Sequence, residues 1–443
     1  MQQVSLNNSK LRLLLEAEYG LLYCATTHSL RKLEPIGVSL LLAIDLGLDE
    51  HQCCEDIIAL NQTRKDDIQK LYRTLFDIYH STSDLSESTD SMSTSVNTHT
   101  RYGDGIYLEV QQLQSIETKN LHSENFHQGD LRPDLKRNLL NIDTGQCIFQ
   151  IDCQQPKLAA DLRSLFKPLI NTTANNSNLP RFSFEIKKRT HTETNRFESQ
   201  PGDTTFDFYS NGHLVLTDLL FEHIAAVLIE RMQIITFQIS GFRFCFHGAA
   251  LSKDKHLFLL PGKSGVGKST LTAYLANRGF TVHSDEMITL DEDFRVLSIR
   301  MPVAIKSGAW ETVTKQYPQL LDAPVWQLLD GREVKYIWTD SQLQADLSVE
   351  SVFSQHQHVH FIAPNYRLGV SADAVNQSDV NSQPLTVIDT IETVTKGGYQ
   401  VGKELLFKDV AELSSYIQNA SREILTYSSS EQAYSWIENL FNK

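Results

Sequence analysis

The segment from Gly262 to Ser269 reads GKSGVGKS and fits the pattern G-x-x-x-x-G-K-[S/T], which is typical of phosphate binding. Glycines let consecutive backbone N–H groups face one concavity that cradles phosphate oxygens, and the helix that follows adds its positive end. In such a loop Lys268 would reach the β and γ phosphates, and the Ser269 hydroxyl would bind Mg²⁺. The expected nucleotide-binding residues are Gly262, Lys263, Ser264, Gly265, Val266, Gly267, Lys268, Ser269 and Thr270.

Phosphate binding by such a loop needs a strand before it and a helix after it, and the sequence predicts both. Residues 256–260 (HLFLL) predict a buried strand directly before the loop, and Ser269 to Asn277 predict a helix with leucines on its inner face. Gly279 stands where the end of that helix is expected. Because so short a pattern also occurs by chance, a glycine turn without a ligand is the alternative. The order of strand, loop and helix favours nucleotide binding.

Two acidic residues follow the next predicted strand, Phe280 to His283. They are Asp285 and Glu286, and Asp285 lies only 17 positions after Lys268. This short spacing predicts that both carboxylates lie on the strand next to the loop, beside a γ-phosphate. A carboxylate in that place can hold Mg²⁺ or accept a proton from an attacking hydroxyl group.

The motifs that flank the loop resemble those of the HPr kinase/phosphorylase family. They are His247-Gly248-Ala249-Ala250 before the loop, Arg278-Gly279 at the end of the helix, and Ser284-Asp285-Glu286 after the next strand. The resemblance is specific over residues 242–310 and weaker over 142–441. It implies an α/β fold with a P-loop kinase domain of the HPr-kinase type that uses ATP and Mg²⁺.

The resemblance also implies roles for single residues. Asp285 matches the family's catalytic acid/base, and Lys268 and His247 complete the catalytic set. Ser269 and Glu286 match the residues on the metal side of the site. The family's later glutamate motif is replaced here by the residues IRMP at 299–302, which argues against HPr as the substrate and against phosphorylase activity.

This departure resembles a divergent group of HPr-kinase-related kinases that act on peptides or small molecules. The shared features are Asp330-Gly331-Arg332 followed by Val334 and Tyr336, then Pro364 followed by Tyr366. Three cations, Lys306, Arg332 and Arg367, have two interpretations. They would either neutralise charge on the transferred phosphoryl group or be ordinary surface cations.

Two further groups of side chains raise the question of metal binding. His356, His358 and His360 alternate on a predicted strand and therefore share one face, which we interpret as solvated rather than metal-binding. Cys53 and Cys54 lie beside His51, but the six cysteines of the chain are scattered without a repeated spacing. We expect them to be reduced and mostly buried, as in a cytoplasmic protein.

Residues 1–79 predict a small winged-helix-like α+β domain, with strands at 13–15 and 19–23 and helices at 38–46, 50–61 and 64–79. This order resembles the PqqD-like peptide-recognition modules, which implies that a leader peptide adds as a strand to an open edge. A plain structural domain is the alternative. DNA binding is disfavoured because residues 1–80 hold 8 Lys/Arg and 11 Asp/Glu.

The remaining chain divides by composition. Residues 80–100 are rich in Ser and Thr and predict a disordered linker that lets the first domain move independently. Residues 101–241 predict a strand-rich first part of the kinase region, with strands at 147–151, 182–187 and 207–209 and an amphipathic helix at 218–232. Residues 242–443 predict the catalytic domain, with a polar loop at 371–384 and a closing helix at 431–441.

The overall composition narrows the class of protein. A formal net charge of −14 argues against nucleic acid and against an anionic membrane as partners. No apolar run approaches the length of a membrane span, and the first residues do not resemble a signal peptide, so we expect a cytoplasmic protein.

The sequence therefore predicts an ATP-dependent, Mg²⁺-assisted kinase that transfers the γ-phosphoryl group to a hydroxyl, above all of serine, in a peptide or protein. Peptide natural-product maturation is one setting for such an enzyme. One alternative is a kinase for free serine or another small metabolite, in which the first domain serves homo-oligomer formation. Another is a nucleotide-binding peptide chaperone or regulator without phosphoryl transfer.

Overall fold

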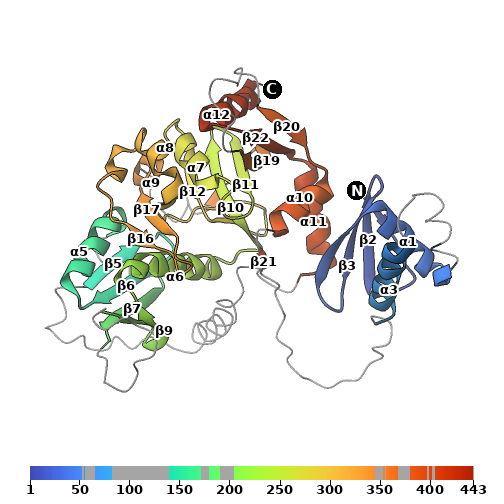
Figure 1. Ribbon diagram of the computed structural model, residues 1–443, viewed down its shortest axis with the longest axis horizontal. Helices are drawn as coiled ribbons and strands as arrows, with labels where there is room; N and C mark the ends of the chain where they lie inside the picture. The colour runs from blue at the N-terminus through green and yellow to red at the C-terminus, as the bar shows by residue number, and fades with distance from the viewer. Residues whose placement is uncertain are drawn as a thin grey trace.

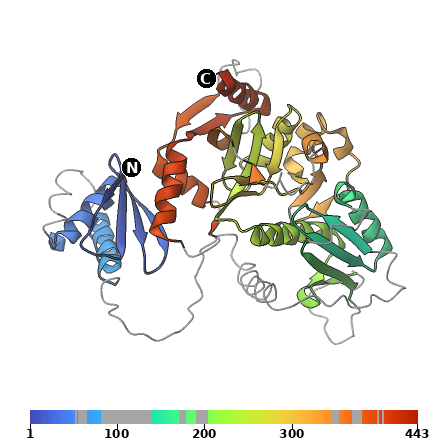
Figure 2. The same cartoon turned by 180° about the vertical axis from the view of Figure 1, so that it is seen from behind.

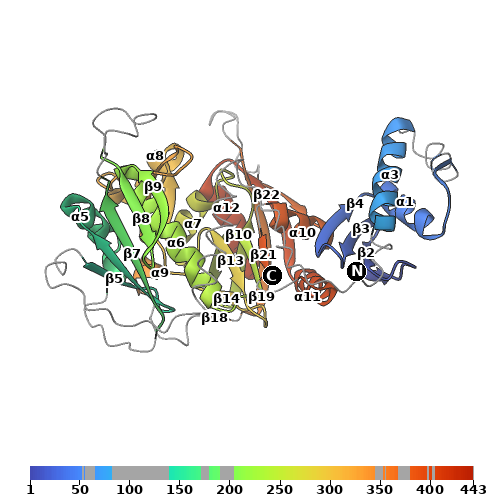
Figure 3. The same ribbon diagram turned by 90° about the horizontal axis from the view of Figure 1, so that it is seen from below.

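The computed structural model describes residues 1–51, 54, 65–81, 139–170, 179–189, 204–344, 353–354, 356–367, 380–396, 399–401 and 405–442. Within these residues the chain is a mixed α/β protein whose strands form four sheets, as the sequence predicts for the fold class. Three parts lie in a row: a five-stranded sheet with its helices, a large central sheet, and an N-terminal module at the other end (Figure 3).

The N-terminal module is an antiparallel meander with helices on one face. Its elements are β1 (Gln2–Val4), β2 (Leu11–Glu16), β3 (Tyr19–Cys24), β4 (Ser29–Leu33), α1 (Pro35–Asp45) and α3 (Lys65–Ser81). The predicted strands at 13–15 and 19–23 and the first and last predicted helices are confirmed. Most of the helix predicted at 50–61 lies outside the described residues.

The first two residues of the linker predicted at 80–100 are helical. His80 and Ser81 belong to the last turn of α3, because Ile78 and Tyr79 still pack toward the core of the module and hold that turn in place. Residues 82–100 lie outside the described residues, as does the strand-rich prediction for 101–138.

The second part is a five-stranded sheet in the order β5-β6-β7-β8-β9, where only β6 and β7 are parallel. Its elements are β5 (Leu139–Asp143), β6 (Ile148–Cys153), α5 (Pro156–Leu165), β7 (Arg181–Lys188), β8 (Phe206–Ser210), β9 (His213–Leu219) and α6 (Ile224–Ile239). The predicted strands at 147–151, 182–187 and 207–209 are confirmed.

The helix predicted at 218–232 is wrong in its bounds and in its type. Asp218 and Leu219 end β9, and α6 begins only at Ile224. α6 is apolar on nearly all sides because it lies between the five-stranded sheet and the rest of the C-terminal part (Figure 2). A helix that is buried on nearly all sides has no continuous polar face, so the amphipathic interpretation fails.

The central sheet runs in the order β18-β14-β13-β10-β11-β19-β22-β20, and β12 and β21 also pair with β10. The strands are β10 (Phe244–Lys253), β11 (His256–Pro261), β12 (Thr281–Ser284), β13 (Met287–Leu290), β14 (Val296–Leu297), β18 (Phe353–Ser354), β19 (His358–Tyr366), β20 (Asn381–Pro384), β21 (Tyr399–Val401) and β22 (Ser421–Tyr427). β11, β19 and β22 are parallel neighbours, so their carboxyl ends meet at one edge.

Helices cover both faces of this sheet. α7 (Lys268–Ala276) and α12 (Ser430–Glu438) pack on the face that carries Phe258 and Leu260, whereas α10 (Val387–Lys396) and α11 (Phe407–Gln418) pack on the face of Leu257 and Leu259. Burial on both faces explains why β11 reads as an unbroken apolar run. The predicted helix after the loop and the predicted closing helix are confirmed.

The polar segment at 371–384 is not a loop throughout. Residues 381–384 form β20, which pairs antiparallel with β22 at the edge of the central sheet, where a polar strand can face solvent. Residues 371–379 lie outside the described residues.

The smaller elements lie beside α7. β15 (Val303–Lys306), β17 (Glu333–Ile337) and β16 (Trp326–Gln327) form a three-stranded antiparallel sheet, accompanied by α8 (Trp310–Thr314) and α9 (Asp340–Gln344). A separate apolar cluster joins Ala273 of α7 to Val303 and Ile305. This small sheet therefore approaches the glycine-rich loop from the helix side.

The N-terminal module is packed against the central part, contrary to the independent motion expected from the linker. Figure 1 shows α10 and α11 between the central sheet and the N-terminal strands. Leu14, Leu21 and Tyr23 share one buried cluster with residues of α10, α11 and the central sheet, and the Tyr23 hydroxyl donates to the Leu405 carbonyl at 2.7 Å. An apolar face of this kind excludes water, which favours the docked arrangement.

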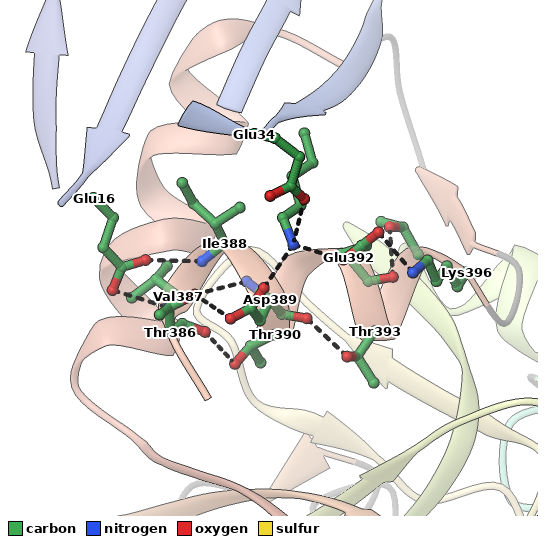
Figure 4. Close-up of polar contacts among 12 residues, drawn as sticks. Glu16, Glu34, Thr386, Val387, Ile388, Asp389, Thr390, Glu392, Thr393 and Lys396 are labelled. Atoms are coloured by element: carbon green, nitrogen blue, oxygen red, sulfur yellow. Dashed lines mark hydrogen bonds and ion pairs between the residues drawn. The ribbon is translucent and has the colours of Figure 1, made fainter. Parts of the chain in front are cut away.

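A polar latch of Glu16 and Lys32 joins the module to the start of α10, and Figure 4 shows Glu16 beside the first residues of this helix. Both Glu16 carboxylate oxygens accept backbone hydrogen bonds there, from Val387 N–H at 3.0 Å and Ile388 N–H at 2.9 Å. The first N–H groups of a helix lack partners within it, so the N-terminal module completes a helix of the other part. Lys32 contacts Asp389 at 2.8 Å, and this partner raises the pKa of Lys32.

We predict that Glu16→Ala loosens this junction by about 1 kcal/mol, the usual cost of losing an N-terminal cap. The amides of Val387 and Ile388 should then exchange with deuterium faster, because their acceptor is gone. Glu18→Ala is the matched control, since the Glu18 side chain is exposed two residues away. Equal protection of both amides in Glu16→Ala and wild type would show that the latch contributes nothing.

Candidate functional site

The glycine-rich loop joins β11 to α7 and turns through left-handed backbone. Gly265 and Gly267 have φ of +92° and +93°, angles that residues with a side chain rarely adopt. Gly267 is the residue directly before the first turn of α7, whose free N–H groups face the loop. The sequence places glycine where the chain must bend most, and the result is a concavity beside a helix N-terminus.

Lys268 is buried in the wall of this concavity. Its ammonium group donates to the carbonyls of Gly262 at 2.7 Å and Lys263 at 2.8 Å and lies 3.1 Å from His247 Nε2. Burial lowers the pKa of Lys268 to about 8, although the charges of Glu286 and Asp285 oppose the change. The cation is thus held within its own loop, where phosphate oxygens could replace the two carbonyls.

Asp285 lies between β12 and β13 and is only 6% exposed. Neither of its carboxylate oxygens has a hydrogen-bond partner of ordinary geometry among the described residues, and the same is true of the Thr272 hydroxyl. Burial, with the charge of Glu286, raises the pKa of Asp285 to about 7, while the nearby hydroxyls of Ser269 and Thr272 lower it. A carboxyl group with this pKa can take up and release a proton at neutral pH.

His247 comes from β10 and stands between Lys268 and Glu286. Its Nδ1 lies 3.5 Å from Glu286 Oε2, and burial lowers the pKa of His247 to about 4. The imidazole is therefore neutral at pH 7, with one nitrogen protonated. An Nδ1–H directed at Glu286 and an Nε2 that accepts from Lys268 satisfy both neighbours.

Two of the three cations singled out in the sequence reach the loop. Lys306 Nζ donates to Ser264 Oγ at 2.7 Å, and Arg332 Nη1 donates to the same oxygen at 3.0 Å. Lys306 is the last residue of β15, and Arg332 directly precedes β17, so both belong to the small three-stranded sheet or its turn. Arg332 also forms an ion pair with Asp330. The third cation, Arg367, is exposed and directly follows β19. β19 lies on the far side of β11 from β10, the strand that carries His247.

The structure thus brings Lys268, Asp285, His247, Glu286 and Ser269 into one cluster at the loop. These are the predicted catalytic and metal-side residues: His247 comes from β10, and Lys268 and Ser269 come from α7. Asp285 and Glu286 lie in the turn between β12 and β13 rather than on the strand next to the loop, where the sequence predicts them, because β12 ends at Ser284 and pairs with β10. Sequence reasoning missed Thr272, whose hydroxyl lies beside Asp285. A threonine one turn into the helix is a weak signal, because its position in the sequence does not show which side chain its hydroxyl approaches.

The donor set fits Mg²⁺ bound together with phosphate. Within the described residues, no group of three or more His, Cys, Asp or Glu side chains could hold a metal ion. Mg²⁺ in phosphoryl-transfer sites needs only one or two carboxylates, because phosphates and water supply the other ligands. The unpartnered oxygens of Asp285, with Glu286 and the Ser269 hydroxyl, are ligands of this kind.

The histidine face expected from the sequence is not solvated throughout. His360 is buried, 2.9 Å from His256 Nδ1 and 2.6 Å from Ser421 Oγ, and His356 precedes β19 rather than lying on it. The face is covered because α12 and the chain end pack on it, with Phe441 against His256. The described cysteines Cys24, Cys54, Cys147, Cys153 and Cys245 are buried, as predicted.

In comparisons with known proteins, no protein-family model and no curated protein matches the chain. The part of the chain that the structure describes holds no helix with the length and apolar character needed to cross a membrane.

The buried Asp285 predicts an unusual dependence of stability on pH. Its pKa is raised in the folded chain, so the folded state binds more protons than the unfolded state between about pH 4 and pH 7. Stability is therefore lost as the pH rises through this window. We predict that Asp285→Asn melts at a higher temperature than wild type at pH 8 and that the difference shrinks toward pH 4.

The control for this measurement is Asp322→Asn, which makes the same change at an exposed position. It should leave the melting curve unchanged at every pH. A lower melting temperature for Asp285→Asn at pH 8 would mean that the Asp285 carboxylate stabilises the fold, which contradicts a raised pKa for this group.

Proposed function

We propose that the protein is a kinase that transfers the γ-phosphoryl group of Mg²⁺-bound ATP to a hydroxyl, above all of serine, in a peptide or protein. The observation that carries this proposal is the pair formed by a glycine-rich loop with its buried Lys268 and an unpartnered Asp285 beside it. A protein that only bound a nucleotide would need a carboxylate at most for Mg²⁺, whereas a carboxyl group with a pKa raised to about 7 is also suited to accept a proton.

Each residue of the cluster has a proposed role that its position supports. Loop amides and Lys268 would hold the triphosphate, and Asp285 would accept the proton as the acceptor oxygen attacks the γ-phosphorus and the bond to the β-phosphate oxygen breaks. Mg²⁺, when bound by Ser269 and Glu286, would supply positive charge to the phosphates. His247 stays neutral and orients Lys268, because a second cation there would compete with it.

Lys306 and Arg332 supply further positive charge at the outer side of the loop. Both side chains donate to the hydroxyl of Ser264, a residue of the loop, so both cations lie beside the loop. In phosphoryl transfer, fixed cations stabilise charge on the phosphoryl oxygens, and most of the catalysis is positioning. Both contacts support the functional interpretation of Lys306 and Arg332 over that of ordinary surface cations.

The N-terminal module is the proposed recognition site for a peptide substrate. One face of its sheet is covered by α1 and α3 and the other by α10 and α11. A leader peptide would therefore have to add along an edge, and β4 ends the sheet on the side that carries Lys32. This arrangement is consistent with PqqD-like recognition and does not require the module to move freely.

We predict that Lys268→Ala weakens ATP binding and nearly abolishes transfer, because the loop loses the charge that meets the β and γ phosphates. Lys315→Ala, at an exposed lysine, is the control. The measurement is the transfer of labelled γ-phosphate to serine-containing peptides, with ATP affinity determined in parallel. Wild-type turnover in Lys268→Ala would contradict the loop assignment.

We predict a different result for Asp285→Asn. The amide cannot accept the proton, so the transfer rate should fall roughly 10²–10⁴-fold while ATP affinity stays within about threefold. If affinity falls together with rate, Asp285 serves the metal and Glu286 becomes the base. If free serine is phosphorylated faster than any peptide, the small-metabolite alternative replaces the peptide kinase, and ATP binding without any transfer favours the regulator.

A further inference from the structure

Two tyrosines stand beside the glycine-rich loop on the side away from Asp285. Tyr366 ends β19 and Tyr427 ends β22, and the two residues are direct partners in the parallel pairing of these strands. The N–H of Arg367 donates to the Tyr427 carbonyl at 3.0 Å and holds the two strand ends together. Their rings lie with centroids 5.8 Å apart and form a tilted pair.

Both side chains touch the last glycine of the loop. A β-carbon placed on Gly267 would lie 3.1 Å from Tyr366 Cβ and 3.4 Å from the Tyr427 hydroxyl. Gly267 directly precedes Lys268, so the tyrosines are neighbours of the residues proposed to hold the phosphates. Parallel strands bind ligands beyond their carboxyl ends, which is where both tyrosines lie.

The exposure of Tyr366 and the missing hydrogen-bond partner of Tyr427 both point to a ligand. Tyr366 is 42% exposed although it is a large aromatic residue beside a packed loop. The Tyr427 hydroxyl is buried, faces Gly267 and has no hydrogen-bond partner among the described residues. A buried hydroxyl without a partner is costly, and the cost is removed when a ligand supplies the partner.

We propose that Tyr366 and Tyr427 form the subsite for the aromatic base and sugar of the nucleotide. The ring of Tyr366 offers its exposed face for stacking, and the Tyr427 hydroxyl donates to a polar atom of the nucleoside. This inference rests on the proposed function, which requires a triphosphate but does not say how the nucleoside is held. Stacking accepts any base, so the subsite favours nucleoside triphosphates over inorganic phosphates without choosing the base.

The test compares the binding of ATP and of inorganic triphosphate to the full-length chain by calorimetry. Tyr366→Ala should bind ATP about tenfold more weakly, because one stacking contact is lost, and bind triphosphate as wild type does. Tyr366→Phe should match wild type for both ligands. Tyr427→Phe should lose about fivefold in ATP affinity and nothing in triphosphate affinity. Retained triphosphate binding also shows that each variant is folded.

Tyr366→Leu is the matched control, since it keeps apolar bulk beside Gly267 without an aromatic face. It should bind ATP as weakly as Tyr366→Ala. Wild-type ATP affinity in Tyr366→Ala or in Tyr366→Leu, or an equal loss for both ligands, would overturn the stacking subsite and leave the kinase proposal standing. A wild-type chain that binds neither ATP nor triphosphate would overturn the proposed function and the subsite together.

Discussion

The carboxyl group of Asp285 is buried next to the ammonium group of Lys268 without a hydrogen bond of ordinary geometry among the described residues. Ionising such a group costs on the order of a few kcal/mol, which the rest of the fold must offset. The surrounding fold keeps most water from this carboxyl group, because Asp285 is only 6% exposed. Burial and the neighbouring charge of Glu286 disfavour the charged carboxylate, whereas Lys268 favours it, so a proton or a cation bound at Asp285 would lower this cost.

The central sheet determines which residues can meet at that point. β10 carries His247, the turn after β12 carries Asp285 and Glu286, and β11 leads into the loop, so three neighbouring strands deliver the cluster. On the other side β19 and β22 end in tyrosines. The N-terminal module is bound to the same body through α10, whose first N–H groups have Glu16 as their acceptor. In the proposed function, peptide recognition and chemistry would therefore occur in parts that pack against each other.

Much of this cluster follows from the sequence because its signals are local. The glycines, the lysine and the first acidic residue lie within 24 residues, from Gly262 to Asp285, and the apolar run before them reads directly as a buried strand. Residues that reach the site through tertiary packing carry no such signal: Tyr427 and Thr272 look like ordinary strand and helix residues. The same reason explains the errors, since the burial of α6 and His360 depends on neighbours that are distant in the chain.

The protonation state of Asp285 tests the central claim most directly. Infrared difference spectra of wild type against Asp285→Asn, recorded from pH 4 to pH 9, isolate the carbonyl band of the protonated Asp285 carboxyl group. If Asp285 is the base, this band should titrate with a midpoint near the raised pKa of about 7. A midpoint near 4, the ordinary value for aspartate, would mean that the carboxylate is charged and compensated throughout, and would contradict its assignment as the base.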